Sequence, residues 1–159
     1  TTLLCARALK SVDRHMTILT ASFQVALELA AHPQFDVISL PGAVELQEGL
    51  VHGPETLKFI AEYNVQCAII GASAVDKTGV SEALPSAAGV YTAMIEQAQQ
   101  VVIVADRSKF GGTSLKRILR WNERTTLVTD TPPTREIAQS LADNAVQVLI
   151  ADENSAAAD

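Results

Sequence analysis

The sequence predicts an α/β fold with a largely parallel sheet and helices on both of its faces. Short runs of β-branched and aliphatic residues alternate along the chain with longer segments of helical period. The runs are apolar on both sides, as is typical of strands that are covered on both faces. Repeated strand–helix–strand units imply right-handed crossovers and therefore a mainly parallel sheet. With 159 residues, the chain has the length of one domain.

The expected strands are the six short apolar runs. They are residues 16–19, 35–40, 67–70, 101–105, 126–128 and 146–150.

The segments between these runs carry helix signals. Residues 2–9 read as a helix at the start of the chain. Ser22 is a suitable N-cap for the next helix, which Pro33 ends. Pro54 suits the first position of a third helix. A fourth helix is expected over residues 87–98, and residues 131–133 are expected to open a fifth.

Composition excludes several classes of function. Apolar residues make up 48% of the chain, enough for a core, but aromatic residues make up only 4%, so a stacking surface for single-stranded nucleic acid is not expected. The net charge of −6 opposes binding to a phosphate backbone by this chain alone. No apolar run approaches about 18 residues, which argues against a membrane span. Without a signal peptide or an initiator Met, the chain reads as a cytoplasmic fragment of a longer polypeptide.

Metal and cofactor chemistry is not predicted. Cys5 and Cys67 are too few for a disulfide framework or a Cys-rich zinc site, and both are expected to be reduced thiols in the core. The histidines do not pair at helical spacing. The chain also lacks a Walker-type loop, a dinucleotide-binding glycine motif and a nucleophile elbow. We therefore predict no cofactor, no metal and no catalytic residue.

A ligand site is expected beyond the carboxyl ends of the strands, where open parallel sheets bind their ligands. The loops there are rich in Gly, Ser and Thr, which offer backbone N–H groups and hydroxyls to an anionic oxygen. The alternative is that turn chemistry alone favours these residue types. The loops are residues 20–22, 41–43, 71–73, 106–112 and 129–131.

Basic residues are concentrated in one segment, because residues 107–124 hold six of the twelve lysines and arginines. Lys109 precedes a flexible Phe-Gly-Gly turn and is the candidate to meet a phosphate. The other basic residues are expected on a solvated or subunit-facing surface. Trp121 is expected to be a packing or interface anchor. Asp76 would contact sugar hydroxyls or, alternatively, cap its own turn.

These loops together resemble those of one protein family, the C-terminal effector-sensing domains of DeoR-type bacterial transcriptional regulators. The resemblance covers nearly the whole chain, and Ser-Lys-Phe-Gly is its strongest element. The matching stretches are Leu19-Thr20-Ala21-Ser22, Leu40-Pro41-Gly42, His52-Gly53-Pro54, Ile70-Gly71-Ala72-Ser73-Ala74-Val75-Asp76, Ala93-Met94-Ile95, Ala105-Asp106-Arg107-Ser108-Lys109-Phe110-Gly111 and Val128-Thr129-Asp130.

The resemblance implies a fold similar to ribose-5-phosphate isomerase and the CoA transferases. It implies that residues 1–151 form a non-enzymatic sensor of a sugar phosphate or related polyol, followed by a flexible tail at 152–159. It also implies a homo-oligomer that reaches operator DNA through an N-terminal helix-turn-helix, which this chain lacks together with the first strand of the domain. The ligand-binding residues expected on this basis are Thr1, Thr2, Thr20, Ser22, Gly42, Gly71, Asp76 and Lys109.

One stretch departs from the family pattern. The family has a Glu and a Lys where this chain has Ala87 and Tyr91. Related isomerases use a carboxylate and a lysine near this region, so the loss of both charges argues against the alternative of a sugar-phosphate isomerase-type enzyme. A third possibility is a purely oligomerising domain whose pocket has decayed.

Overall fold

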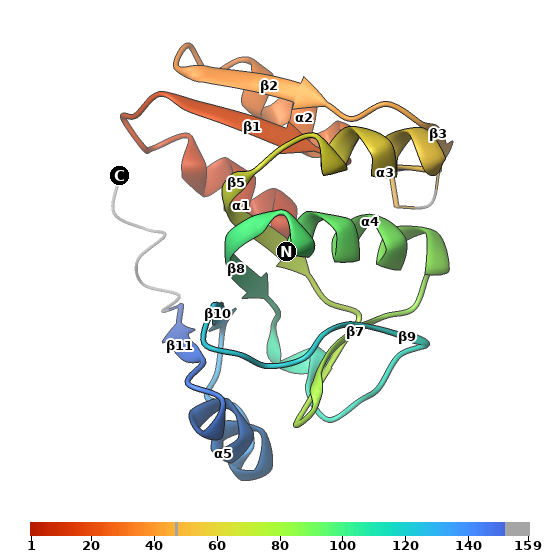
Figure 1. Cartoon of the computed structure of the whole chain (residues 1–159). Coiled ribbons are helices and arrows are strands. Elements are labelled where there is room, and N and C mark those ends of the chain that lie inside the picture. The colour runs from red at the N-terminus through yellow and green to blue at the C-terminus, as the bar shows by residue number, and fades with distance from the viewer. Residues whose placement is uncertain (47, 152–159) are drawn as a thin grey trace. The chain divides into compact units, whose positions relative to one another are not determined.

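The computed structural model describes residues 1–46 and 48–151 (Figure 1). The tail expected at 152–159 lies outside the described residues. The chain divides into two compact units, Thr1–Tyr63 and Asn64–Asp159.

The first unit is built on two parallel strands. Helix α1 (Thr2–Leu9) precedes β1 (Met16–Thr20), and α2 (Phe23–Ala30) connects β1 to β2 (Phe35–Ser39). The two strands pair in register, with Ile18 beside Val37. The core of this unit is formed by residues of α1, α2 and β2, namely Ala6, Leu29 and Phe35.

The first unit ends in a small hairpin and a helix. Strands β3 (Ala43–Glu45) and β4 (Leu50–His52) pair antiparallel, and α3 (Pro54–Ala61) follows. Proline at the start of α3 fits because the first N–H groups of a helix have no partner within the helix.

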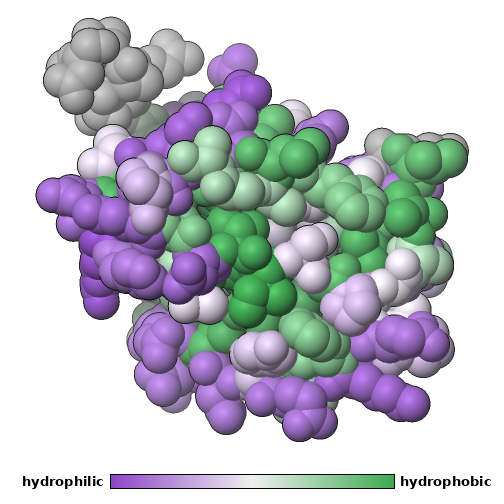
Figure 2. Space-filling view, turned by 90° about the horizontal axis from the view of Figure 1, so that it is seen from above, coloured by the Kyte–Doolittle hydropathy of each residue, from purple (hydrophilic) through white to green (hydrophobic). Residues whose placement is uncertain are grey.

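Large hydrophobic side chains remain exposed in this unit. Leu27 of α2 is 78% exposed and Leu46, after β3, is 87% exposed. Figure 2 shows hydrophobic colour gathered in the middle of the face seen from above, with hydrophilic residues along its edges.

The second unit contains a four-stranded parallel sheet in the order β11-β10-β8-β5 (Figure 1). Its register places Val102 between Ile69 and Thr126. Two helices, α4 (Pro85–Glu96) and α5 (Arg135–Asp143), contribute to its core. The strands are β5 (Val65–Gly71), β8 (Ala98–Val104), β10 (Thr125–Thr129) and β11 (Gln147–Ile150).

The second unit also contains a smaller, three-stranded antiparallel sheet. Strand β7 (Gly79–Glu82) lies between β6 (Ala74–Asp76) and β9 (Lys116–Leu119). A short 3-10 helix, η1 (Arg107–Lys109), follows β8. The basic segment of the sequence therefore runs from η1 through the edge strand β9.

The predicted α/β fold with a parallel sheet flanked by helices is confirmed, and all six expected strands are present. Two helix boundaries were wrong. The helix expected through residue 98 ends at Glu96, because Ala98 already begins β8. The fifth helix begins only at Arg135, because Thr134, the residue after the two prolines, is its N-cap and has an extended ψ of 155°.

The prediction for the cysteines was wrong at Cys67, which is exposed, and Cys5 is only half-buried. Cys67 lies on the side of β5 opposite to the buried residues Ala68 and Ile70, so the apolar run of this strand did not mean burial on both faces. Trp121 is 5% exposed and packs in the core, as predicted. Among the described residues, no helix is long and apolar enough to cross a membrane.

Candidate functional site

Three parallel strands of the second unit end at one edge of the sheet. They end at Gly71, Val104 and Thr129, and the loops that follow carry the expected binding residues of this unit. The backbone N–H of Arg107 donates to Asp130 Oδ1 at 2.7 Å. The loop after β8 is thereby attached to the loop after β10.

The loop that carries Lys109 is fixed at both ends. Asp106 accepts a hydrogen bond from the Ser108 N–H at 2.9 Å and so caps η1. Hydrogen bonds from Ser108 and, to a lesser extent, the charge of Lys109 lower the pKa of the Asp106 carboxyl. On the far side, the N–H of Gly111 donates to the carbonyl of Val75 at 2.9 Å.

Lys109 itself is half-buried. Its ammonium has no hydrogen bond or ion pair with any residue in the described part of the chain, and the charge that it acts on is the carboxylate of Asp106. A cation on an anchored loop at the carboxyl edge of a parallel sheet is available to an anion from solution.

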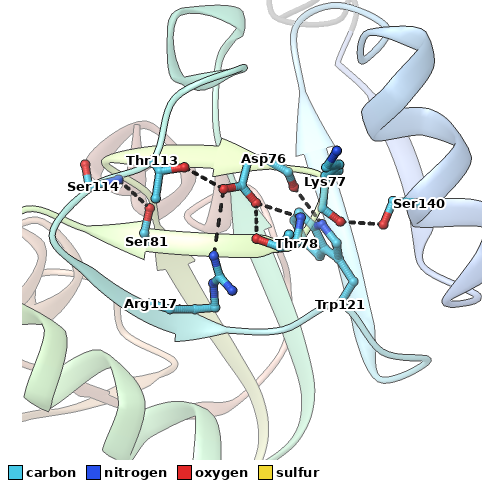
Figure 3. A network of polar contacts seen from close by, with 9 residues as sticks. All are labelled: Asp76, Lys77, Thr78, Ser81, Thr113, Ser114, Arg117, Trp121 and Ser140. Atoms are coloured by element: carbon cyan, nitrogen blue, oxygen red, sulfur yellow. Dashed lines mark hydrogen bonds and ion pairs between the residues drawn. The ribbon is translucent and has the colours of Figure 1, made fainter.

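The carboxylate of Asp76, at the end of β6, is the centre of a network of polar contacts (Figure 3). Oδ1 accepts from the N–H of Thr78 at 2.6 Å and from its hydroxyl. Oδ2 accepts from the hydroxyl of Thr113 at 2.7 Å and lies 3.9 Å from a guanidinium nitrogen of Arg117. The carbonyl of Asp76 accepts from the indole N–H of Trp121 at 2.9 Å.

This network determines the ionisation of Asp76. Burial by itself raises the pKa of the carboxyl, but hydrogen bonds from Thr78 and Thr113 and the charge of Arg117 together lower it below its usual value. Both oxygens are thus engaged by the protein. This arrangement is the turn-capping alternative considered for the sequence, and contact of Asp76 with a ligand stays a prediction.

The turn after Asp76 is attached to α5. Lys77 Nζ lies 2.6 Å from Glu136 Oε1. The hydroxyl of Ser140 donates to the carbonyl of Lys77 (Figure 3). A shallow surface hollow lies over this attachment, lined by residues of the turn and of α5. Lys109 does not line this hollow.

Sequence reasoning missed Glu82, a buried carboxylate at the end of β7. Its Oε1 accepts from the hydroxyl of Ser73 at 2.7 Å and from the N–H groups of Ala83 and Leu84 at 2.8 and 3.1 Å. The side chain therefore fixes the loop after β5 to the start of α4. An acidic residue shortly before Pro85, where a helix begins, was the signal available in the sequence.

The stretch that departs from the family pattern lies on α4. Ala87 is 1% exposed, and Tyr91 is half-buried and packs against the main core. Neither side chain supplies the carboxylate or ammonium that isomerase chemistry would require at these positions.

The remaining expected residues lie in the first unit. Thr20 Oγ1 accepts from the N–H of Ser22 at 3.1 Å, and Ser22 Oγ accepts from the N–H of Val25 at 3.4 Å, which confirms Ser22 as the N-cap of α2. Both hydroxyls act as acceptors in these bonds, so their own O–H groups remain able to donate.

Gly42 follows β2 in a conformation that favours glycine, with φ of 144°. A Cβ at this position would lie 2.2 Å from Thr56 Oγ1 and 2.5 Å from the carbonyl oxygen of His52, so no other residue fits without a shift of the backbone. Thr1 is the exposed N-cap of α1 and makes no side-chain capping bond, and Thr2 is the first residue of the helix.

The structure thus distributes the expected ligand residues over the two units. Gly71, Asp76 and Lys109 belong to the second unit and the other five to the first. No group of His, Cys, Asp or Glu residues in the described ranges is arranged to hold a metal ion.

Comparison with known proteins gives a consistent result. Residues 1–131 match the family model described as the DeoR C terminal sensor domain. The chain is 30% identical over 150 residues to the HTH-type transcriptional repressor GlcR of Bacillus subtilis, a match that covers 94% of this chain and 57% of that protein. It is 28% identical over 135 residues to the glycerol-3-phosphate regulon repressor of Escherichia coli, covering 84% of this chain and 54% of that protein.

A third relative is the transcriptional repressor AccR of Agrobacterium fabrum, 30% identical over 130 residues, which are 80% of this chain and 50% of that protein. The chain spans about half the length of the curated relatives that it matches.

Proposed function

The chain belongs to the family of DeoR C-terminal sensor domains, and we propose that it is the part of a transcriptional repressor that senses a phosphorylated sugar or a related polyol. The observation that carries the proposal is the half-buried ammonium of Lys109, which lacks a bonded partner in the described residues and stands on a loop anchored at the carboxyl edge of the sheet. The name of one relative, a glycerol-3-phosphate regulon repressor, supports a phosphorylated effector.

In this proposal, residues of both units are assigned contacts with the effector. In the second unit, Lys109 contributes charge, Gly71 a backbone donor and Asp76 contact with hydroxyls. In the first unit the contacts are hydroxyl or backbone donors, from Thr1, Thr2, Thr20, Ser22 and Gly42.

The complete protein, in this proposal, is a cytoplasmic homo-oligomer. Residues 1–151 form most of its sensor domain, and the part that precedes them supplies the first strand of the domain and a helix-turn-helix that binds operator DNA. Symmetric operators match symmetric proteins, which favours an oligomer. The effector changes affinity for the operator only if it binds two arrangements of the subunits with different affinity.

The sensor is proposed to be non-enzymatic. The positions where isomerase chemistry would need a carboxylate and an ammonium hold Ala87 and Tyr91, and Ala87 is fully buried. A coupled aldose–ketose assay with turnover would contradict this part of the proposal.

The effector can be sought by thermal unfolding of the full-length protein with a panel of sugar phosphates and the matching free polyols. A ligand at about 100 times its Kd adds about 2.7 kcal/mol to the free energy of unfolding, which raises the midpoint by several degrees. A panel that leaves the midpoint unchanged would contradict the sensing role and favour an oligomerising domain with a decayed pocket.

Lys109→Ala tests the role assigned to the ammonium. We expect the variant to lose the shift caused by a phosphorylated ligand while its ligand-free midpoint stays unchanged, because Lys109 makes no hydrogen bond or ion pair with the described residues. Lys116→Ala, which removes an exposed lysine of β9, is the matched control and should keep the shift. A fall in the ligand-free midpoint of Lys109→Ala would make Lys109 structural.

A further inference from the structure

Strand β6 has β7 on one side and the loop after β8 on the other. It pairs antiparallel with β7, with Ala74 beside Ser81. On its other side, Val75 forms a parallel bridge with Phe110, the residue after Lys109. All of these residues belong to the second unit. The first residues of β6 therefore separate β7 from Lys109.

The same register, extended by one residue, places Ser73 of the loop after β5 beside Glu82 at the end of β7. A contact between the two side chains agrees with this register, since Ser73 Oγ donates to Glu82 Oε1 at 2.7 Å. Neighbouring strands are about 4.8 Å apart, so the backbones of Glu82 and Lys109 are separated by roughly 10 Å across β6.

The carboxylate of Glu82 is engaged at one oxygen only. Oε1 accepts from the hydroxyl of Ser73 and from the N–H groups of Ala83 and Leu84. Oε2 accepts no hydrogen bond from the described residues, and it is not one of their fully buried unpaired atoms, so it reaches solvent. The three donors to Oε1 thus orient the carboxylate and leave Oε2 available.

Within the described residues, no cation pairs with this carboxylate. Lys116 lies opposite Glu82 on β9, but its side chain is exposed and forms no ion pair with Glu82. Glu82 is only 8% exposed, and a carboxylate oxygen in a largely buried side chain is costly to leave without a donor. Because a carboxylate accepts hydrogen bonds and repels anions, the ligand group that suits Oε2 is a hydroxyl.

The two groups on either side of β6 offer different chemistry to a ligand. Lys109 offers an ammonium to an anion, and Glu82 offers a carboxylate oxygen to a hydroxyl. A phosphorylated polyol carries both kinds of group, whereas inorganic phosphate carries no carbon-bound hydroxyl and a free polyol carries no anion. Asp76, by contrast, already has both of its carboxylate oxygens bonded within the protein.

We propose that Glu82 is a ligand-binding residue whose Oε2 accepts hydrogen bonds from the hydroxyls of the effector. The inference rests on the proposed function and deepens it, because it makes hydroxyls on the same molecule as the phosphate a requirement for tight binding. Ser73 is then a positioning residue, since its hydroxyl holds the other oxygen of the carboxylate.

This requirement can be measured on the native full-length protein by calorimetric titration. The probes are inorganic phosphate, propyl phosphate, glycerol 3-phosphate and ribose 5-phosphate, of which propyl phosphate has the carbon chain of glycerol 3-phosphate without its hydroxyls. We expect at least one of the two hydroxylated phosphates to bind at least about 10-fold more tightly than propyl phosphate, the factor that corresponds to one hydrogen bond to a charged group.

Glu82→Gln assigns this preference to the carboxylate. The amide keeps an oxygen for the three donors that hold Oε1, so the ligand-free unfolding midpoint should change little, but it places an N–H donor where Oε2 accepts. We expect the variant to lose the preference for hydroxylated phosphates while its Kd for propyl phosphate stays unchanged. Glu136→Gln, the same change at a side chain of α5 that is 69% exposed, is the matched control and should keep the preference.

Equal affinity of the native protein for hydroxylated phosphates and propyl phosphate would overturn this inference alone, as would a preference that survives in Glu82→Gln. Weaker binding of propyl phosphate by Glu82→Gln, with a lower ligand-free midpoint, would make Glu82 structural and also overturn it. If Glu82→Gln does not fold, the comparison on the native protein still decides. Lys109→Ala tests the proposed function separately, because it should weaken the binding of all four probes. Failure of every probe to bind the native protein would reject both proposals.

Discussion

Two turns at the same edge of the second unit use polar residues in opposite ways. In the turn after β6 the polar groups bind one another, since the two carboxylate oxygens of Asp76 contact Thr78, Thr113 and Arg117. The loop after β8 is held by its backbone and by Asp106 and Asp130, so the Lys109 side chain is left without a bonded partner in the described residues.

The difference shows what distinguishes a structural turn from a binding loop. Asp, Ser and Thr are favoured both at turns and at anion sites because their side chains bond nearby backbone groups. The residue type alone therefore does not show whether a polar side chain stabilises a turn or binds a ligand. A polar side chain that makes no bond within its own turn indicates a binding role. Mutations in the turn at Asp76 should therefore lower the stability of the fold. Mutations in the loop at Lys109 should instead weaken ligand binding.

The largest effect on stability is expected at Trp121, which is 5% exposed and donates to the carbonyl of Asp76. Trp121→Ala should lower the free energy of unfolding by about 3–5 kcal/mol, because it leaves a cavity and an unpaired carbonyl. Urea denaturation followed by circular dichroism measures the change.

If Trp121→Ala does not fold, Trp121→Phe serves instead, since it keeps most of the packing and removes the N–H donor. A loss below about 0.5 kcal/mol in the Phe variant would show that the hydrogen bond to Asp76 contributes little. Neither variant, where folded, should abolish the ligand-induced shift assigned to Lys109.

A smaller effect is expected for Asp76→Asn. The substitution removes the charge and one acceptor oxygen from a carboxylate that contacts three residues, so we expect the free energy of unfolding at pH 7 to fall by about 1.5–3 kcal/mol. Thr113→Val, which removes one of the donors, should lower the free energy of unfolding by less.

The pH dependence of this loss follows from the lowered pKa of Asp76. A carboxyl with a pKa below its unfolded value, about 3.9, stabilises the fold above that value and loses the contribution as the pH falls through the folded pKa. The difference between the native protein and Asp76→Asn should thus be full at pH 7 and shrink below about pH 4. A difference that stays constant down to pH 2 would show that the charge of Asp76 is not what stabilises the turn.

The parallel strands and most helix starts were predictable because they depend on local patterns. Ser22 and Pro54 marked helix starts, and apolar runs marked all six parallel strands. The antiparallel strands β3, β4, β6, β7 and β9 were missed because each has only three or four residues. The pairing of β7 with β9 also joins residues distant in sequence, such as Ser81 and Arg117.

The loops at the strand ends were also predictable, but their internal bonds were not. The sequence cannot show that Thr113 reaches back 37 residues to Asp76, or that Ser73 bonds Glu82. The apolar run likewise predicted a buried Cys67, because an apolar strand looks the same in sequence whether one or both of its faces are buried.

The smallest effect is expected for Glu136→Gln, which breaks the ion pair that attaches the Asp76 turn to α5. The two side chains are 59% and 69% exposed, so water and salt screen their attraction although the atoms are 2.6 Å apart. The hydrogen bond and the charge of Glu136 raise the pKa of Lys77, so the contribution of this group to stability is present at neutral pH and is lost as the pH rises through that raised value. We expect a drop in the unfolding midpoint smaller than that of Asp76→Asn, and this drop should shrink in 1 M salt, where the Debye length falls to about 3 Å. Ser140→Ala removes the neutral hydrogen bond to the carbonyl of Lys77, and its effect should persist in salt. Equal salt dependence of the two variants would mean that the attachment is not electrostatic in the way the contacts indicate.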